Sequence, residues 1–383
     1  MKALEIALIC TEKLPVPAVA GGAIQIYIDG ILPYLSKHHN ITVFSTSYPG
    51  FPSDEMKNNI HYIRISPINT RYYINTIKSR LDNSFDLVHI FNRPLWLLSI
   101  SESFPNLNLS LSLHNDMFYP DKMTKSEVCD CINKLKFITT VSKYIANEAE
   151  KACPQAKGKI NVVYSGVDAD IYKPPNCDED RLKKNKLKKD YGFHENKIVL
   201  FVGRLNPDKG IHVLISAMEQ IMNQRSDTAL IIVGSKWFGE NKVDTYTKLI
   251  ESLSRKLKGQ VDFTGFLAPS EISAYYNMAD IFVCPSQWNE PLARVLYEAM
   301  AAGLPIVTTN RGGNAEVISN FHNGIVIDDF NNHQCLAQAI SLLLNNPYEA
   351  VEMGKTGRSL AISIYNWERV SDDIQRLISR YLL

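Results

Sequence analysis

The strongest constraint on the fold is a pair of strand series, in which short apolar runs alternate with helical stretches. The first series comprises residues 5–10, 41–46, 86–91, 109–114, 137–142 and 160–165, and the second comprises 197–203, 229–234, 261–266, 280–286, 305–309 and 324–329. Apolar strands separated by helices form parallel sheets that are covered on both faces. The sequence therefore predicts an α/β protein with two doubly wound, Rossmann-like domains.

The expected domain boundary lies where the two series are separated by a Pro-Pro pair, a polar run and a charge cluster. We expect an N-terminal domain over residues 1–172, a linker over 173–190 and a C-terminal domain over 191–365. A chain of 383 residues fits two domains of roughly 150–200 residues each. The last segment, from Asn366, has the pattern of an amphipathic helix that caps one of the domains.

Charge and cysteine content exclude several classes of protein. Lys and Arg number 41 and Asp and Glu number 40, a balance that argues against a nucleic-acid partner. The basic run over residues 181–189 is mixed with acids and indicates a solvated helix face rather than a phosphate site. Seven scattered cysteines without a C-x-x-C pair indicate free thiols in a reducing cytoplasm. No apolar run approaches the roughly 20 residues of a membrane span, which leaves attachment to a membrane surface open.

Glycine pairs follow strands at two places where a phosphate could bind. Gly21-Gly22 and Gly312-Gly313 each stand between a strand and a helix, where backbone N–H groups and the helix dipole favour an anion. A simple turn would explain either pair alone. Neither matches G-x-G-x-x-G, so a nicotinamide or flavin enzyme loses support.

Charged residues after other strands add candidates, because ligands of such sheets bind beyond the carboxyl ends of the strands. Arg204 and Lys209 follow a strand and suit a diphosphate. His114 ends another strand, either as a proton relay or as a structural residue. Glu290 and Glu298 are expected on one helix that starts at residue 289 or 290, with Glu290 at its positive end. Two ordinary surface acids would show the same spacing.

Three segments together resemble the retaining glycosyltransferases of family 4: "GRLNPDKG", "NEPLARVLYEAMAAGLPIV" and "NRGGNAEVI". "GGAIQIYIDGILPYLSK" and "VYSGVDADIYKP" extend the resemblance to nearly the whole chain, and the opening further resembles spore-coat proteins of bacilli. The family implies the GT-B fold, in which two Rossmann-like domains face each other across a deep cleft. It also implies that a terminal helix over residues 366–383 packs back on the N-terminal domain, which binds the acceptor.

Residue by residue, the resemblance implies contacts with a nucleotide-sugar. The expected ligands of the donor diphosphate are Gly21, Gly22, Arg204, Lys209, Leu292 and Ala293. Glu290 and His114 would contact the donor sugar, Glu298 the ribose and Phe266 the base. The catalytic set would be His114, Glu290, Arg204 and Lys209.

The implied reaction transfers a sugar with retention of anomeric configuration, by attack on the face that the leaving phosphate departs from. A UDP-sugar is the favoured donor, with GDP- and ADP-sugars open, and no cofactor or metal ion is required. Asp168-Ala169-Asp170 stands in an interdomain loop and is interpreted as a turn rather than a metal site. The acceptor would be a polysaccharide, a glycolipid or a spore-surface glycan, contacted by loops such as residues 47–58 and 66–82.

Two alternatives remain. The family usually has Phe-Gly where Leu292-Ala293 stand, which favours a weak or inactive protein with a structural or spore-coat role. A different GT-B enzyme, such as a nucleotide-sugar epimerase or a phosphorylase, is the second. A phosphorylase would be larger and would carry a pyridoxal-binding lysine, for which no context stands out.

Overall fold

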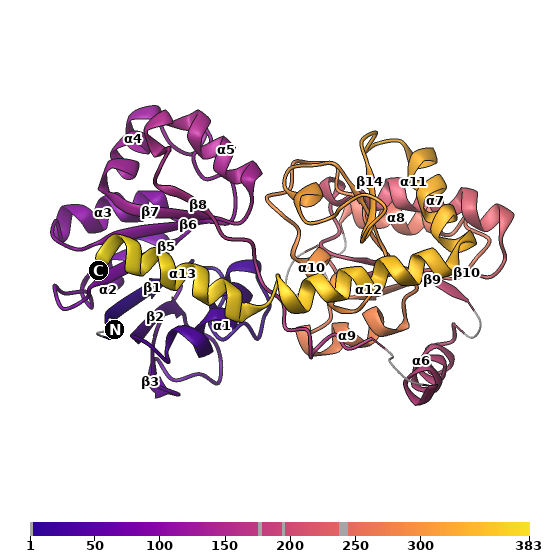
Figure 1. The fold of residues 1–383 in the computed structure, drawn as a ribbon, viewed down its shortest axis with the longest axis horizontal. Helices are drawn as coiled ribbons and strands as arrows, with labels where there is room; N and C mark the ends of the chain where they lie inside the picture. The colour runs from indigo at the N-terminus through magenta and orange to yellow at the C-terminus, as the bar shows by residue number, and fades with distance from the viewer. Residues whose placement is uncertain (1–2, 175–177, 194–195, 237–243) are drawn as a thin grey trace. The chain divides into compact units, whose positions relative to one another are not determined.

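The computed structural model describes residues 3–174, 178–193, 196–236 and 244–383. The chain forms two compact α/β units (Figure 1). Unit 1 comprises Met1–Gly166 and Trp367–Leu383, and unit 2 comprises Val167–Asn366. The division therefore lies a few residues before the boundary expected at residue 172.

Unit 1 is built on one eight-stranded sheet. Its strands are β1 (Glu5–Ile9), β2 (Asn40–Thr46), β3 (Asp54–Lys57), β4 (Ile60–Ile65), β5 (Leu87–Phe91), β6 (Leu109–Leu113), β7 (Leu135–Thr140) and β8 (Ile160–Val162). They lie in the order β3-β4-β2-β1-β5-β6-β7-β8, and all neighbours are parallel except β3 and β4. All six predicted strands of the first series are confirmed.

The β3–β4 hairpin is an addition to the predicted sheet. Part of it falls in residues 47–58, which we expected to be a loop. Asn58 and Asn59 have φ angles of 53° and 63°, the left-handed backbone that a two-residue hairpin turn requires and that asparagine tolerates. The side chains of β3 are mostly exposed, so its sequence lacks the apolar signal of a buried strand.

Helices cover both faces of the unit 1 sheet. They are α1 (Ala23–Leu35), α2 (Thr70–Lys78), α3 (Pro94–Ser103), α4 (Lys125–Lys134), α5 (Lys143–Ala152) and α13 (Trp367–Leu382). Alternate residues of β1 enter different cores. Ala7 and Ile9 pack with α2 to α5, whereas Ile6 and Leu8 pack with α1 and α13.

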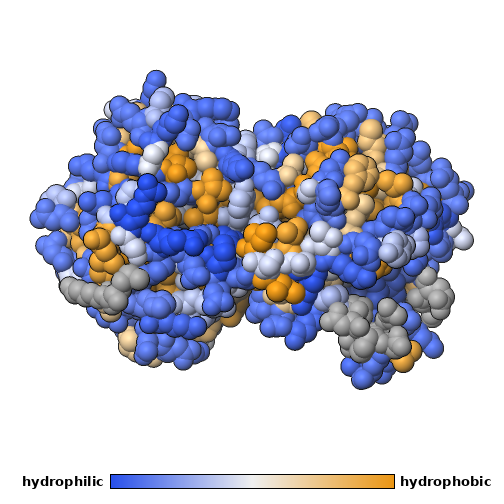
Figure 2. Space-filling model, viewed as in Figure 1, coloured by the Kyte–Doolittle hydropathy of each residue, from blue (hydrophilic) through white to orange (hydrophobic). Residues whose placement is uncertain are grey.

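The terminal helix α13 is part of unit 1 and lies against α1. Its buried side includes Val370, Ile374 and Ile378, and Figure 2 shows a strongly hydrophilic surface along its outer side. At the start of the helix, the Trp367 ring lies over Gly30 of α1, so closely that a Cβ atom on Gly30 would lie 2.2 Å from it. Only glycine fits beneath this ring.

Unit 2 is built on a six-stranded parallel sheet. Its strands are β9 (Lys197–Val202), β10 (Thr228–Val233), β11 (Val261–Gly265), β12 (Ile281–Cys284), β13 (Ile306–Thr309) and β14 (Gly324–Ile327). These confirm the second predicted series. The strand order is β11-β10-β9-β12-β13-β14. The strands that follow β9 are added on one side of it, and β12 to β14 are then added on its other side.

The helices of unit 2 are α6 (Asp178–Asp190), α7 (Ile211–Gln224), α8 (Thr245–Ser254), α9 (Pro269–Met278), α10 (Arg294–Ala301), α11 (His333–Asn345) and α12 (Pro347–Ser363). Apolar residues of α7, α8 and α11 form one core with alternate residues of the strands. The expected linker contains α6, as a helix whose basic side chains are not all solvated. Lys188 donates to Asp280 at 2.7 Å and Lys184 to the same carboxylate at 3.2 Å.

Two further expectations concern cysteines and membranes. The six cysteines that the structure describes are free thiols, and the sulfur atoms of Cys129 and Cys153 lie 2.9 Å apart. Within the described part of the chain, no helix combines the length and the apolar character needed to cross a bilayer.

Gly30→Ala is expected to destabilise unit 1. Alanine in a helix is normally favoured over glycine by about 1 kcal/mol, so propensity alone predicts a gain in stability. Forcing a methyl group into the Trp367 ring instead costs about 1–3 kcal/mol. Urea unfolding would measure the sign of the change. Because Trp367→Leu removes the ring, the double variant should lose less than the sum of the two single losses, and full additivity would contradict the contact.

Candidate functional site

The candidate site of unit 2 lies where the strand order reverses, between the adjacent strands β9 and β12. Loops that leave such neighbouring carboxyl ends run in opposite directions and open a crevice. The β9 loop carries Arg204 and the short 3-10 turn Pro207–Lys209, and the β12 loop carries Glu290. The two loops are joined where the Gln287 backbone N–H donates to the Asp208 carbonyl at 2.7 Å.

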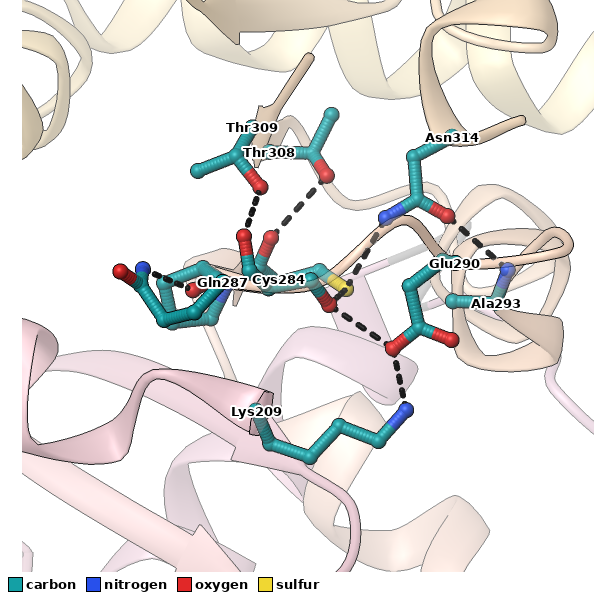
Figure 3. A network of polar contacts seen from close by, with 10 residues as sticks. Lys209, Cys284, Gln287, Glu290, Ala293, Thr308, Thr309 and Asn314 are labelled. Carbon is teal, nitrogen blue, oxygen red and sulfur yellow. Dashed lines mark hydrogen bonds and ion pairs between the residues drawn. The ribbon is translucent and has the colours of Figure 1, made fainter. Parts of the chain in front are cut away.

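Glu290 is buried at this crevice, with a relative exposure of 4%. Its carboxylate is ion-paired with Lys209 and accepts a hydrogen bond from the Ser286 hydroxyl at 2.9 Å (Figure 3). We expected Glu290 in the first turn of a helix, and this was wrong, because α10 begins only at Arg294. Glu290 belongs to the loop, and other loops hold its backbone.

Two glycines let neighbouring backbones approach the β12 loop. Gly313 donates its N–H to the Glu290 carbonyl at 2.8 Å. A Cβ on Gly312, whose φ is 61°, would lie 1.9 Å from that same oxygen. A Cβ on Gly210 would lie equally close to the Pro285 carbonyl. The Gly312-Gly313 pair predicted as a phosphate-binding turn therefore also clamps the backbone of Glu290.

Hydrogen bonds from β13 fix the other end of the loop. Thr308 donates to the Cys284 carbonyl at 3.0 Å and Thr309 to the Ser286 carbonyl at 2.6 Å (Figure 3). These two hydrogen bonds hold the end of β12 against β13, so Ser286 and Glu290 lie on a rigidly supported part of the chain.

Leu292 and Ala293, expected at the donor diphosphate, are both buried just before α10. The Ala293 backbone N–H donates to the Asn314 side chain at 3.0 Å (Figure 3). This amide would have to release Asn314 before it could bind a phosphate. No side chain caps the start of α10.

Glu298, the expected ribose ligand, lies inside α10 and is 8% exposed. It accepts a hydrogen bond from the Tyr276 hydroxyl at 3.0 Å, and Arg294 lies 3.9 Å from its other oxygen. Burial raises the pKa of the Glu298 carboxyl, and Arg294 and Tyr276 oppose the rise.

The remaining expected donor contacts also follow strands. Arg204 comes after β9 and is half-buried, and Phe266 comes directly after β11 and is half-buried as well. Among the described residues, no three His, Cys, Asp or Glu side chains gather as a metal site.

In unit 1, Gly21 and Gly22 precede α1 with φ angles of 76° and 97°. Gly22 is the N-cap of α1, and no side chain caps this helix. A Cβ there would lie 2.3 Å from the Gln25 amide oxygen, and the Gln25 nitrogen donates to Thr11 at 3.3 Å and to the Leu14 carbonyl at 3.3 Å. The loop after β1 is thus wound tightly around the start of α1.

His114 follows β6 and is 8% exposed. Its Nε2 lies 3.1 Å from the Ser112 hydroxyl, and its backbone N–H donates to the Asn92 side chain at 2.7 Å. The rings of Tyr27 and Phe91 pack on it at 4.8 and 5.7 Å between centroids. Both aromatic rings and the strand-end bonds therefore fix the orientation of the imidazole.

Sequence reasoning missed several residues of these sites. Ser286 ends the predicted strand over residues 280–286, and Asn314 lies in the segment "NRGGNAEVI". Each is a polar residue at or after the carboxyl end of a strand, which is a usable signal. Glu12 and Arg93 form a bidentate ion pair with two contacts of 2.9 Å, at the ends of the adjacent strands β1 and β5. Tyr276 could not be identified, since nothing in the sequence around it indicates that its side chain contacts α10.

Known proteins match this chain over both units. Residues 21–171 match the profile "Glycosyltransferase Family 4", and residues 183–360 match "Glycosyl transferases group 1". "Spore coat protein SA" of Bacillus subtilis is 42% identical over 372 residues, which are 97% of this chain and 98% of that protein. The chain belongs to glycosyltransferase family 4.

Solved structures support the GT-B fold expected of a family 4 glycosyltransferase. The chain is similar to Anabaena Alr3699/HepE in complex with UDP-glucose, with a TM-score of 0.78, 20% identity and coverage of 98% of this chain and 100% of that one. Sucrose-phosphate synthase from Thermosynechococcus elongatus gives a TM-score of 0.80 at 20% identity, over 98% of both chains. At this identity the likeness concerns the fold.

Gly312→Ala should both destabilise the protein and abolish binding of the nucleotide part of the donor. The left-handed backbone costs alanine about 1–2 kcal/mol, and displacing the Glu290 carbonyl adds about 1–3 kcal/mol. Gly158→Ala is the matched control, because Gly158 has φ of 91° and no atom within 4 Å of its Cβ position. Thermal unfolding and calorimetric binding of UDP would measure both effects. Equal losses in the two variants would show that the approach to Glu290 is unimportant.

Proposed function

We propose that this chain is a retaining, metal-independent hexosyltransferase that uses a nucleotide-diphosphate sugar, with UDP-sugars favoured over GDP- and ADP-sugars. The observation that carries the proposal is the buried ion pair between Lys209 and Glu290, held at the strand reversal of unit 2. A cation for phosphate and a carboxylate for sugar hydroxyls are thereby fixed side by side. The acceptor is a glycan or a lipid-linked sugar.

Lys209 and Arg204 serve the donor diphosphate in this proposal. Both leave the end of β9, and the Lys209 side chain is 18% exposed, so a ligand in the crevice can reach it. Charge that develops on the leaving diphosphate is stabilised most by cations that are already in place. Two fixed cations supply this stabilisation without a metal ion.

Glu290 changes partner when the donor binds. Without donor, Lys209 neutralises its buried carboxylate. A diphosphate competes for the ammonium group, and the carboxylate, released from Lys209, then accepts hydrogen bonds from the hydroxyls of the donor sugar. Ser286 stays bonded to the carboxylate throughout, at 2.9 Å in this structure, so the side chain keeps its direction.

Residues of unit 1 complete the proposed set. The first-turn amides of α1, behind Gly21 and Gly22, have no capping side chain and suit a phosphate by their dipole. His114 contacts the donor sugar through its ring. Phe266 packs on the base and Glu298 accepts from the ribose. The leaving phosphate takes the proton of the acceptor hydroxyl as it attacks.

The relative named for the spore coat supports one further part of the proposal. A protein 42% identical over nearly its full length suggests that this enzyme acts in the cytoplasm on a cell-envelope or spore-surface glycan, in association with the spore coat or a membrane surface.

One observation favours the alternative, a weak or inactive protein with a structural role. Ala293 stands where the family usually has glycine, and its N–H is already bonded to Asn314. If this bond persists, the diphosphate loses one backbone donor, which is worth about 10²–10³ in kcat at oxyanion sites. Turnover measurements separate the two functions.

The first test is turnover of nucleotide-sugars by the purified chain. We expect release of nucleoside diphosphate from at least one of a panel of UDP-, GDP- and ADP-hexoses, and NMR of the product should show the donor's anomeric configuration. Binding without turnover would favour the structural role. A chain that neither turns over nor is thermally stabilised by any nucleoside diphosphate would disprove donor use.

Lys209→Met should lower kcat by about 10²–10³, because it removes a preformed cation from the leaving diphosphate. Glu290→Gln should lower kcat/KM through weaker acceptance from the sugar hydroxyls. Lys355→Met is the matched control, since Lys355 forms an exposed pair with Glu352 at 2.7 Å worth at most about 1 kcal/mol. Steady-state kinetics would measure these effects, and full activity of Lys209→Met would refute the assigned role.

A further inference from the structure

Tyr276 makes a contact that the proposed reaction does not yet use. It lies in α9, whereas Glu298 lies in α10, and its hydroxyl donates to Oε2 of Glu298 at 3.0 Å. The Tyr276 side chain is 0% exposed. The bond therefore forms between two buried groups that come from different helices.

The Tyr276 ring has little freedom to move. The Tyr172 ring meets it edge-on at 5.3 Å and 87°, and the Phe282 ring of β12 packs on it at 5.6 Å. Because the Tyr276 ring is packed on two sides, its hydroxyl is held in one position. Burial raises the pKa of Tyr276 well above 10, so the hydroxyl remains protonated and donates to the carboxylate.

The groups that face Glu298 come from three segments. Arg294 of α10 lies 3.9 Å from Oε1, Tyr276 of α9 binds Oε2, and Tyr172 lies beside Tyr276. Glu298 thus has one oxygen that accepts from a neutral donor, while its other oxygen lies 3.9 Å from the Arg294 cation, beyond hydrogen-bond distance. An asymmetric carboxylate of this kind offers one oxygen to a ligand.

We propose that Tyr276 is a positioning residue for recognition of the donor ribose, because it holds Oε2 of Glu298 and leaves Oε1 to accept the ribose hydroxyls. This inference rests on the proposed function, specifically on Glu298 as the ribose ligand. Tyr276 touches no substrate. Its effect is confined to the part of donor affinity that depends on the 2′ and 3′ hydroxyls.

The experiment begins with wild-type protein and calorimetric titration of UDP, GDP and ADP. Binding of at least one is expected from the proposed function. If none binds, the proposed function fails at this step. If one binds, the inference about Tyr276 is tested separately with that nucleotide and its 2′,3′-dideoxy form, for example UDP and 2′,3′-dideoxy-UDP.

Tyr276→Phe should weaken UDP binding about tenfold or more, because a hydrogen bond to a charged group is lost. Binding of 2′,3′-dideoxy-UDP should change less than about twofold, since that ligand makes no hydroxyl contact with Glu298. Tyr275→Phe is the matched control, a neighbour on α9 whose ring packs on Tyr191 at 5.5 Å between centroids, and it should affect neither ligand. Equal weakening of both ligands by Tyr276→Phe would overturn the proposal.

The ratio of the affinity for UDP to the affinity for 2′,3′-dideoxy-UDP should also depend on pH. Burial already raises the pKa of Glu298, and loss of the Tyr276 donor raises it further. Protonation removes an acceptor, so the preference for UDP should decline on acidification at a higher pH in Tyr276→Phe than in wild type. The diphosphate titrates identically in both ligands and cancels from the ratio. An unchanged pH profile would contradict the role of Tyr276.

A second background covers the case in which Tyr276→Phe is too unstable to assay. In Glu298→Gln the buried group is neutral, and Tyr276 should draw the amide oxygen toward itself and turn the NH2 group toward the ribose. Adding Tyr276→Phe would free the amide oxygen for the ribose. The preference for UDP over 2′,3′-dideoxy-UDP should then be higher in the double variant than in Glu298→Gln alone. If Tyr276→Phe instead lowers this preference by the same factor as it does when Glu298 is present, Tyr276 has only a structural role.

Discussion

The close approach of the Gly312-Gly313 turn to Glu290 is the contact on which the candidate donor site depends. Glu290 stands in a loop, outside any helix, and a loop residue must be held by other parts of the chain. The Gly313 amide binds its carbonyl, and the missing side chain of Gly312 leaves the space for it. With Thr309 bonded to the Ser286 carbonyl, the ends of β12 and β13 form one rigid edge, and rigid support of this kind is what a precise site requires.

The two glutamates differ in how their burial is compensated. Glu290 is paired with Lys209, and in the proposed reaction the donor diphosphate draws this lysine away from the carboxylate. Glu298 is held by the neutral Tyr276 hydroxyl, which an anion does not compete for. Removing a partner from a buried charge costs about 3–5 kcal/mol, so a ligand must replace what it takes from Glu290. In the proposed reaction, this requirement would couple binding of the phosphate to binding of the sugar.

The sequence predicted the sheets better than the loops, for physical reasons. Buried parallel strands are mostly continuous apolar runs, and twelve of the thirteen in the structure were predicted. Of the hairpin, β3 was missed because its side chains are polar and exposed. β4 was missed because His61 and Arg64 interrupt its apolar residues. The start of α10 was misplaced because Pro291 suits a first turn, whereas the Gly313 amide draws Glu290 into the loop. Glu290 and Lys209 could be named as candidates, but their pairing depends on two loops that lie 81 residues apart in the chain.

The same reasoning connects the terminal helix to His114. The Trp367 ring covers Gly30 and meets the edge of Tyr27 at 5.8 Å and 88°. Tyr27 in turn meets His114 at 4.8 Å and 86°. Three rings in successive edge-to-face contact leave no room for one to turn without displacing the next. The last helix of the chain therefore supports the orientation of a histidine at the carboxyl end of β6.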